Sequence, residues 1–480
     1  MKKALSILLS LLMAFSVFGG LSLPTAHAAG TGKALQLMPN GAAANLTGAQ
    51  TSSVWFGRYK NTGSRRTGSE VRPLKWRVLS NANGKLFLIT DQNIDMVPYN
   101  SENVDVTWEN CTQRAWLNGE GADQFIGSAF GSLEAAAILP TQLQNAANPK
   151  NGTPGGNNTT DRVFSLSIAE ATNTSYGFAN NYNSSSTRLA TNTEYTSNGG
   201  TFGNSSANGT GNSYWWLRSP GSDAGYKAYI DWDGAVVVDG LYIDYTMIAV
   251  RPAMNLDLSK VVFTSAAEGG KPGDGSFSPI SDYNGTEWKL TLLDASRTFA
   301  VTETSATAVA GGSVTLHYSG AAVGANEYVS AIVTNAAGAA VYYGRLSQPE
   351  AAEGDLTLTV PALDAGSYTL KVFSEQYNGD FNTDFASAFD DVSLTVITQF
   401  AMDKINAKAE LETYKNAADY RAAEQAELAA AIAAGAVLTE GTSYTVTYSS
   451  GCKAKGTYTV TVTAIGSYYT GTVEKTFTIK

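Results

Sequence analysis

The sequence is poor in cysteine and histidine, with two of each among 480 residues. Cys111 and Cys452 fall in different expected domains, so a disulfide framework is not predicted and a single bridge between them has little support. Apart from His27 near the N-terminus, the only histidine is His317, within an alternating stretch typical of a β-strand. A Ser-His-Asp or Cys-His arrangement would need this one residue, and zinc sites built from His and Cys are excluded.

Basic clusters and long apolar runs are also missing. The formal net charge is −10 without a basic cluster, which excludes nucleic acid as an expected partner. Lys2 and Lys3, the apolar run Leu5–Val17 and the small-x-small site Ala26–Ala28 together predict a signal peptide over residues 1–28. An uncleaved anchor is the alternative, although the run is short for a span. We therefore expect a secreted, extracellular or cell-surface protein without a transmembrane segment after signal removal.

The rest of the chain changes composition several times, which predicts a multidomain α+β protein. A Gly/Pro-rich stretch at Lys271–Ser276 indicates a linker, and an Ala/Glu/Lys-rich stretch before Gly435 indicates helix. The expected segments are a lead-in at 29–53, a mixed α+β head at 54–262, a linker at 263–285, an all-β sandwich at 286–398, a helical spacer at 399–435 and a small C-terminal β-module at 436–480.

The head begins with expected strands at 54–59, 74–79 and 85–90, the last two joined in a hairpin by Asn83-Gly84. Thr107 is expected to cap a helix over Trp108–Asn118, and a second helical segment is expected at 125–138.

Residues 145–212, rich in Asn, Gly, Ser and Thr, predict a long loop that is either functional or disordered. One ordered island, 162–171, interrupts it with a short strand and a capping box made by Ser167 and Glu170. Deleting this loop except the island is expected to leave the head folded.

The densest apolar stretch runs from Tyr214 to Leu258 and contains two arginine motifs separated by a predicted Asp-Gly hairpin turn. We expect Trp215 and Trp216 to lie in the core. Arg218 and Arg251, the latter followed by Pro252, are expected to bind buried carbonyls or acids rather than a ligand. We therefore predict that these five residues have a structural role.

Six residues of the same stretch are candidates for ligand binding. Trp232, Tyr242 and Tyr245 could stack on a sugar or contact a protein surface. Asp231, Asp233 and Asp244 offer clustered oxygens of the kind that calcium prefers. Their spacing matches no complete calcium loop, so the turn is the favoured interpretation. No metal or cofactor is expected, and calcium is the alternative.

The motif Trp215-Trp216-Leu217-Arg218-Ser219-Pro220-Gly221, followed by Ala249-Val250-Arg251-Pro252-Ala253, resembles the DUF6273 domains of secreted proteins from Gram-positive bacteria. The resemblance covers roughly 54–258, with Ala249 where the family pattern has glycine. It implies a head distantly similar to the C-type lectin-like fold. The chemistry of formylglycine-generating enzymes, which share that fold, is not carried over, because it needs a cysteine pair and Cys111 is alone in the head.

The later segments carry resemblances of their own. The sandwich is similar to the immunoglobulin-like domains that follow such heads, including the stretch Phe373–Asp380. The C-terminal module resembles short β-repeats of bacterial surface proteins, through Leu438–Val446.

Three functions remain open from the sequence. The first is a non-catalytic binding or adhesion protein whose head recognises an extracellular glycan, a protein or the cell wall. The second is a structural cell-surface or matrix protein without a small ligand. The third is a glycosidase that uses paired carboxylates, for which acidic residues are plentiful but no motif selects a pair.

Overall fold

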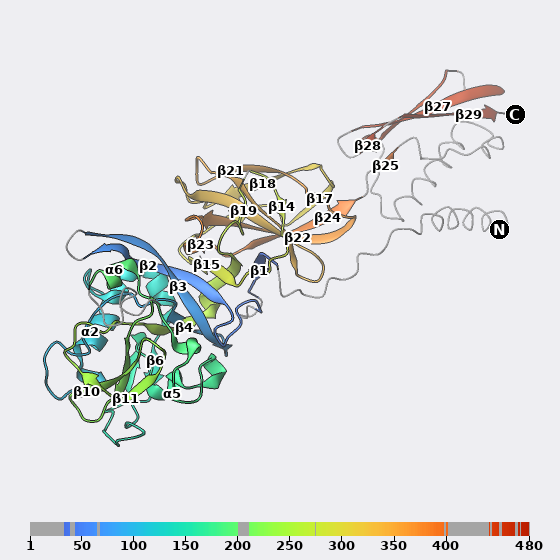
Figure 1. The fold of residues 1–480 in the computed structure, drawn as a ribbon. Coiled ribbons are helices and arrows are strands. Elements are labelled where there is room, and N and C mark those ends of the chain that lie inside the picture. The colour runs from blue at the N-terminus through green and yellow to red at the C-terminus, as the bar shows by residue number, and fades with distance from the viewer. Residues whose placement is uncertain are drawn as a thin grey trace.

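The computed structural model describes residues 33–38, 44–64, 68–199, 211–273, 275–397, 400–401, 441, 444–450, 454–465, 469–470 and 472–479. The expected signal peptide and all but two residues of the expected helical spacer lie outside these ranges. Within them the chain is largely β, and its helices are short. None of these helices is long and apolar enough to cross a membrane. Figure 1 shows the head, the sandwich and the C-terminal module following one another.

The head is organised around four antiparallel strands: β2 (Ser53–Ser64), β3 (Gly68–Ala82), β4 (Lys85–Thr90) and β12 (Ala253–Asp257). Asn83 and Gly84 join β3 to β4 with φ angles of 54° and 70°, the left-handed conformation of a type I′ turn. The predicted hairpin is therefore confirmed. β12 pairs along β4, which brings the second arginine motif beside this hairpin.

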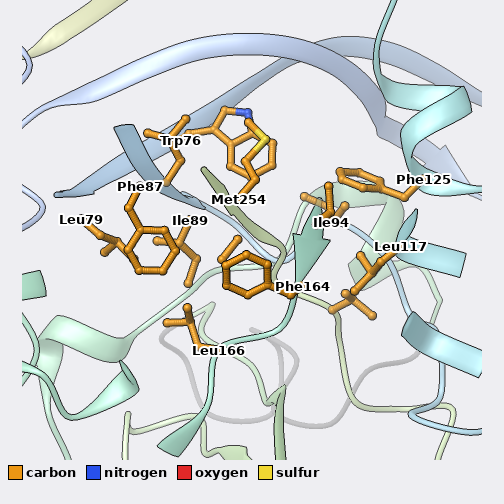
Figure 2. Close-up of a cluster of buried hydrophobic side chains, with 14 of the residues drawn as sticks. Trp76, Leu79, Phe87, Ile89, Ile94, Leu117, Phe125, Phe164, Leu166 and Met254 are labelled. Atoms are coloured by element: carbon orange, nitrogen blue, oxygen red, sulfur yellow. The ribbon is translucent and has the colours of Figure 1, made fainter. Parts of the chain in front are cut away.

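The core of the head lies against this sheet. Figure 2 shows side chains of β3 and β4, such as Trp76 and Phe87, meeting Phe164 and Met254, which come from distant parts of the chain. Phe87 and Phe164 stack with their ring centroids 5.9 Å apart. Trp215 and Trp216 are fully buried and belong to the same core.

The predicted helix Trp108–Asn118 is interrupted. Trp108–Asn110 forms the 3₁₀ turn η2, Cys111 is extended, and α2 runs over Thr112–Asn118. The cap of α2 is the Cys111 sulfur, which accepts the Arg114 N–H at 3.4 Å, so the prediction that Thr107 caps one continuous helix is wrong. The second predicted helical segment forms α3 (Phe125–Ala129) and α4 (Ser132–Ala137), because the backbone is extended at Phe130 and Gly131.

The expected long loop is wrong in part: outside the island, residues 145–199 contain β7 (Thr159–Asp161), η3 (Thr174–Tyr176), η4 (Ser186–Arg188) and α6 (Glu194–Ser197), while 200–210 lie outside the described ranges. β5 (Ile138–Leu139) and β6 (Thr141–Leu143) come just before this segment, and β8 (Val163–Phe164) and α5 (Ile168–Ala171) form the predicted island. The capping box of Ser167 and Glu170 on α5 is confirmed.

Buried polar side chains anchor this segment, which explains why a polar composition did not predict its order. The Asn148 side-chain amide donates to the carbonyls of Pro220 and Val238, both at 2.7 Å. Asp161 is buried and accepts the Trp108 indole N–H at 2.9 Å. Deleting 145–212 except the island would remove Asn148 and Asp161, and the loss of these contacts weighs against the prediction that the head would still fold.

A second, three-stranded sheet carries the first arginine motif and the predicted turn. It is ordered β11 (Val236–Tyr242), β10 (Tyr226–Ile230), β9 (Trp215–Pro220). Gly234 has φ +82°, and a Cβ there would lie 2.1 Å from the Ser185 carbonyl oxygen, so the turn requires glycine. The predicted hairpin between β10 and β11 is confirmed.

The head and the sandwich share one continuous sheet. β15 (Glu287–Leu293) pairs parallel with β2 of the head and then with β23 (Asp384–Ala386), and antiparallel with β13 (Val261–Ala266). β1 (Leu35–Leu37) of the lead-in pairs with β13. The expected linker 263–285 contains most of β13 and all of β14 (Ser278–Pro279), and its Lys271 is buried, so it is not a free connection.

The sandwich packs two groups of strands around an apolar core. One is a three-stranded sheet of β16 (Ala300–Val301), β18 (Ser313–Ser319) and β21 (Gly354–Thr359). The other extends the shared sheet with β17 (Ser305–Val309), β19 (Glu327–Thr334), β20 (Ala340–Ser347), β22 (Gly366–Gln376) and β24 (Asp390–Ile397). The all-β character predicted for 286–398 is confirmed over the described residues, and buried side chains alternate with exposed ones along the strands, as at Val314 and Leu316.

His317 lies on β18 with its side chain exposed, where its Nδ1 is 2.5 Å from Oε1 of Glu303. This contact raises the pKa of His317 above its ordinary 6.5. The stabilising contribution of the pair is therefore complete below pH 6.5 and is lost as the pH rises through the raised pKa.

We expect NMR titration of a chain that lacks residues 1–28, in which His317 is the only histidine, to give this raised pKa. Glu303→Gln should lower the His317 pKa, whereas Asp355→Asn should change it less, because Asp355 is 3.6 Å from Nε2. An unchanged His317 pKa in Glu303→Gln would contradict the assignment of the shift to this pair.

The C-terminal module is small. β26 (Tyr444–Tyr448), β27 (Gly456–Ala464) and β29 (Thr472–Ile479) form an antiparallel sheet, as expected for a β-module. β25 (Phe400–Ala401) pairs in parallel with β28 (Tyr469–Thr470). Among the described residues of this module, Val460, Phe477 and Ile479 form a buried apolar cluster. Cys452 lies outside the described residues, and Cys111 is a buried free thiol.

Candidate functional site

Large exposed apolar side chains gather on the part of the head that contains β10 and β11. Trp232 is 38% exposed, Tyr242 41% and Tyr245 36%. Met247 is also exposed, as is Tyr182, whose carbonyl accepts the Val236 N–H of β11 at 2.9 Å. In Figure 1, β10 and β11 lie at the end of the head farthest from the sandwich. An exposed cluster of this kind is typical of an interaction surface.

Trp232 lies at the tip of the β10–β11 hairpin, where the neighbouring aspartates hold the turn. One oxygen of Asp231 accepts the Trp232 N–H at 2.6 Å, and Asp233 accepts the Ala235 N–H at 2.9 Å. Asp233 also accepts the Ser184 hydroxyl. Burial raises the pKa of Asp231. These carboxylates are engaged in the fold of the turn.

Three tyrosines meet at the other end of the hairpin, and we call Tyr226, Tyr242 and Tyr245 the tyrosine patch. The ring centroids of Tyr226 and Tyr242 are 4.4 Å apart, and those of Tyr242 and Tyr245 are 5.8 Å apart. A hydrogen bond to Tyr242 raises the pKa of Tyr226 to about 12. The Tyr226 phenol therefore stays neutral at physiological pH and can take part in hydrogen bonds.

The six predicted ligand residues do not form one site. Ile230 pairs with Val236 beside the tip, and Tyr226 pairs with Tyr242 at the opposite end. Four residue steps of a strand separate these pairs by about 13 Å. Asp231, Trp232 and Asp233 are therefore at one end. Tyr242 is at the other, and Asp244 and Tyr245 follow it in the chain, with Asp244 half-buried.

Both motif arginines, Arg218 and Arg251, are buried and form hydrogen bonds within the head. Arg218 forms a bidentate ion pair with Glu170 and donates to the Ser165 carbonyl at 3.0 Å. Arg251 is fully buried, donates to the Thr90 carbonyl at 2.9 Å and lies over the Trp215 ring at 5.1 Å. Burial lowers the pKa of Arg251. Pro252, which is also buried, accepts the Thr90 N–H through its carbonyl at 3.0 Å.

Arg188 is a third buried arginine, which sequence reasoning missed. Its guanidinium donates to the carbonyls of Gly234 at 2.7 Å, Ala179 at 2.9 Å and Asn183 at 2.5 Å. Its own carbonyl accepts the Trp215 indole N–H at 3.2 Å. Arg188 therefore ties residues 179–188 to the hairpin that presents Trp232. It lies in a polar segment without apolar periodicity, so no sequence pattern indicated its burial.

A shallow groove of about 390 Å³ lies elsewhere on the head, beside the β2–β3 hairpin. Tyr59, Lys60, Asp95, Trp116 and Tyr195 contribute to its lining. The Tyr59 hydroxyl donates to Asp95 at 2.6 Å, and the Lys60 ammonium lies 5.6 Å from the centre of the Tyr195 ring. Sequence reasoning missed this groove because its residues are distant in the chain.

Within the described ranges, no set of three or more His, Cys, Asp or Glu is placed to hold a metal ion. Burial raises the pKa of the Cys111 thiol to about 12, so this residue is a packed thiol rather than a thiolate nucleophile. Burial lowers the pKa of Lys227 to about 8, and its ammonium lies 5.0 Å from the centre of the Tyr99 ring.

The fold and this surface define a largely β multidomain protein whose head presents exposed aromatic side chains. Residues 83–258 match the model of a domain of unknown function, DUF6273. A DUF6273 domain thus spans the part of the head from the β3–β4 turn to the end of β12 and includes both arginine motifs. No curated protein matches the chain.

Proposed function

We propose that this is a secreted, non-catalytic binding or adhesion protein of a Gram-positive bacterium, associated with the cell surface or its surroundings. Its head recognises an extracellular glycan or protein ligand through the tyrosine patch. The observation that carries the proposal is the exposure of Tyr242 and Tyr245 in ring contact at the far end of the molecule. Tyrosines offer an apolar face and a hydroxyl, which suits both sugar rings and protein hot spots.

The domain architecture in this proposal is a C-type lectin-like head followed by an immunoglobulin-like sandwich. Two facing groups of strands support the second assignment. So does Tyr368, whose hydroxyl donates to the Asp364 carbonyl at 3.1 Å, as in the tyrosine corner of immunoglobulin-like domains. In this arrangement the sandwich and the C-terminal module hold the head away from the site of attachment, which can be the cell wall.

We expect the full mature chain to bind specific spots on an array of glycans and extracellular proteins. Tyr242→Ala combined with Tyr245→Ala should weaken that binding by about tenfold or more, because central aromatic side chains dominate such interfaces. Binding should be the same with and without a calcium chelator, since the proposed surface needs no metal. Surface plasmon resonance with the molecules that bind on the array gives the dissociation constants.

Val323→Ala is the matched control, because Val323 is 55% exposed but lies in the sandwich, and its binding should equal that of the wild type. Trp232→Ala tests whether the ligand extends along the hairpin, and Trp116→Ala tests the groove. Loss in Trp116→Ala alone would refute the tyrosine patch. If the folded chain binds nothing on the array, a structural role is favoured. If it hydrolyses a glycan and substitution of one carboxylate abolishes the hydrolysis, the glycosidase is favoured.

A further inference from the structure

Four charged side chains are sealed inside the junction between the head and the sandwich. They are Lys271, Lys289, Glu375 and Asp384, and each side chain is at most 1% exposed. They come from the segment after β13, from β15, from β22 and from β23. Two ammonium groups and two carboxylates balance in charge, but such a buried network carries a large desolvation penalty.

Lys271 is in direct contact with both Asp384 and Glu375. Nζ of Lys271 lies 2.6 Å from Oδ2 of Asp384 and 2.6 Å from Oε1 of Glu375. Oδ1 of Asp384 accepts the Asn378 N–H at 2.8 Å, which fixes the orientation of the carboxylate. The reactive groups are therefore held together, with an acid–base residue at hydrogen-bond distance.

The site is closed to solvent and is lined by aromatic rings and hydroxyl groups. The ammonium of Lys271 lies 4.5 Å from the centre of the Phe263 ring, and that of Lys289 lies 4.5 Å from the centre of the Tyr377 ring. Oε2 of Glu375 accepts the hydroxyls of Tyr343 at 2.6 Å and Ser330 at 2.7 Å, so Glu375 cannot turn away. Burial lowers the pKa of Lys289 to about 8.

We propose that Lys271 and Asp384 form an intramolecular isopeptide bond, with Glu375 as the residue that relays the proton. The site holds an amine against a carboxyl group in a pocket that excludes water, so the effective concentration is high and hydrolysis is suppressed. The product replaces one buried ion pair by a neutral amide, which removes part of the desolvation penalty. Lys289 and Glu375 remain as one balanced pair.

The reaction is a dehydration that needs no oxidant or cofactor. A proton moves from the Lys271 ammonium to the Asp384 carboxylate, which leaves a neutral amine and a carboxylic acid. The amine nitrogen attacks Cγ of Asp384, and Glu375 takes the second nitrogen proton and passes it to the departing Oδ2 hydroxyl. The C–N bond forms, the Cγ–Oδ2 bond breaks and one water leaves, while Oδ1 stays as the amide oxygen.

Geometry favours Lys271 over Lys289 as the amine that attacks Asp384. Lys271 contacts both Asp384 and Glu375, whereas Lys289 contacts Asp384 at 2.8 Å and donates to the Gly379 carbonyl at 2.6 Å. Only the Lys271 nitrogen thus has the relay residue at hydrogen-bond distance among the described contacts. The bond would join positions 113 residues apart in the chain.

The test is mass spectrometry of the purified full-length mature protein. We expect an intact mass lower than that of the linear chain by one water. A tryptic digest should contain a branched peptide that joins 261–289 to 372–404, because Lys271 precedes proline and Lys289 remains cleavable. An intact mass equal to that of the linear chain, with both peptides recovered unbranched, overturns the proposal.

Three variants assign the roles. Lys271→Arg keeps a positive charge but lacks a nucleophilic amine, and Glu375→Gln keeps the shape but cannot take a proton, so both should show the linear mass. Lys289→Arg is the matched control and should retain the loss of one water. Retention of the bond in Lys271→Arg, or its loss in Lys289→Arg alone, overturns the assignment to Lys271.

Discussion

Arg188→Met is expected to destabilise the head by about 4 kcal/mol or more, because each buried carbonyl left without a donor costs about 1–3 kcal/mol. Arg188 is fully buried and donates to the carbonyls of Gly234, Ala179 and Asn183. For a domain of this size, such a loss lowers the thermal midpoint by about 8–16 °C. Tryptophan fluorescence can follow it, since seven of the eight tryptophans lie within 54–262.

Arg188→Lys is the matched variant for this prediction. Lysine keeps the positive charge, but its single ammonium group cannot reach carbonyls on both sides of the planar guanidinium. We expect an intermediate loss of stability and a more mobile hairpin tip, with faster hydrogen exchange at Trp232. A midpoint for Arg188→Met within 1 °C of the wild type would show that these carbonyls find other donors.

Glu170→Ala is expected to cost about 3 kcal/mol of the free energy of unfolding of the head, because it leaves a buried guanidinium without its counter-ion. The side chain of Arg218 is 3% exposed and pairs with both oxygens of Glu170. The same carboxylate accepts the Ser167 N–H at 2.8 Å and completes the capping box of α5. Urea unfolding followed by tryptophan fluorescence measures the loss.

Glu120→Ala is the control for Glu170→Ala. Glu120 also pairs with an arginine of the head, Arg162, but its side chain is 73% exposed. Exposed pairs contribute roughly 0–1 kcal/mol, so Glu120→Ala should unfold close to the wild type. Equal losses in the two variants would mean that Arg218 finds another partner when Glu170 is removed.

Glu170 also shows how far the sequence predicts this fold. The capping box follows from two residues three positions apart, and the β3–β4 hairpin follows from Asn83-Gly84, so both are local patterns. The partner of Glu170 is Arg218, which is 48 residues later in the chain. No local pattern specifies that contact, and the same holds for Arg188 and the Gly234 carbonyl.

The candidate site was predicted in part for the same reason. Exposure of Trp232 follows from its place in a hairpin turn beside two aspartates. The separation of Trp232 from Tyr242 depends on the register between β10 and β11, which composition does not fix. The order within the long loop was not predicted because Asn148 and Arg188 hold it by hydrogen bonds, and such anchors leave no hydrophobic periodicity.

The position of β15 has a mechanical consequence for a protein that binds at one end and is attached at the other. β15 is hydrogen-bonded in parallel to β2 of the head and to β23 of the sandwich. Separating the two domains therefore requires the hydrogen bonds of β15 to β2 or to β23 to break. The junction is expected to act as a stiff coupling rather than as a free hinge.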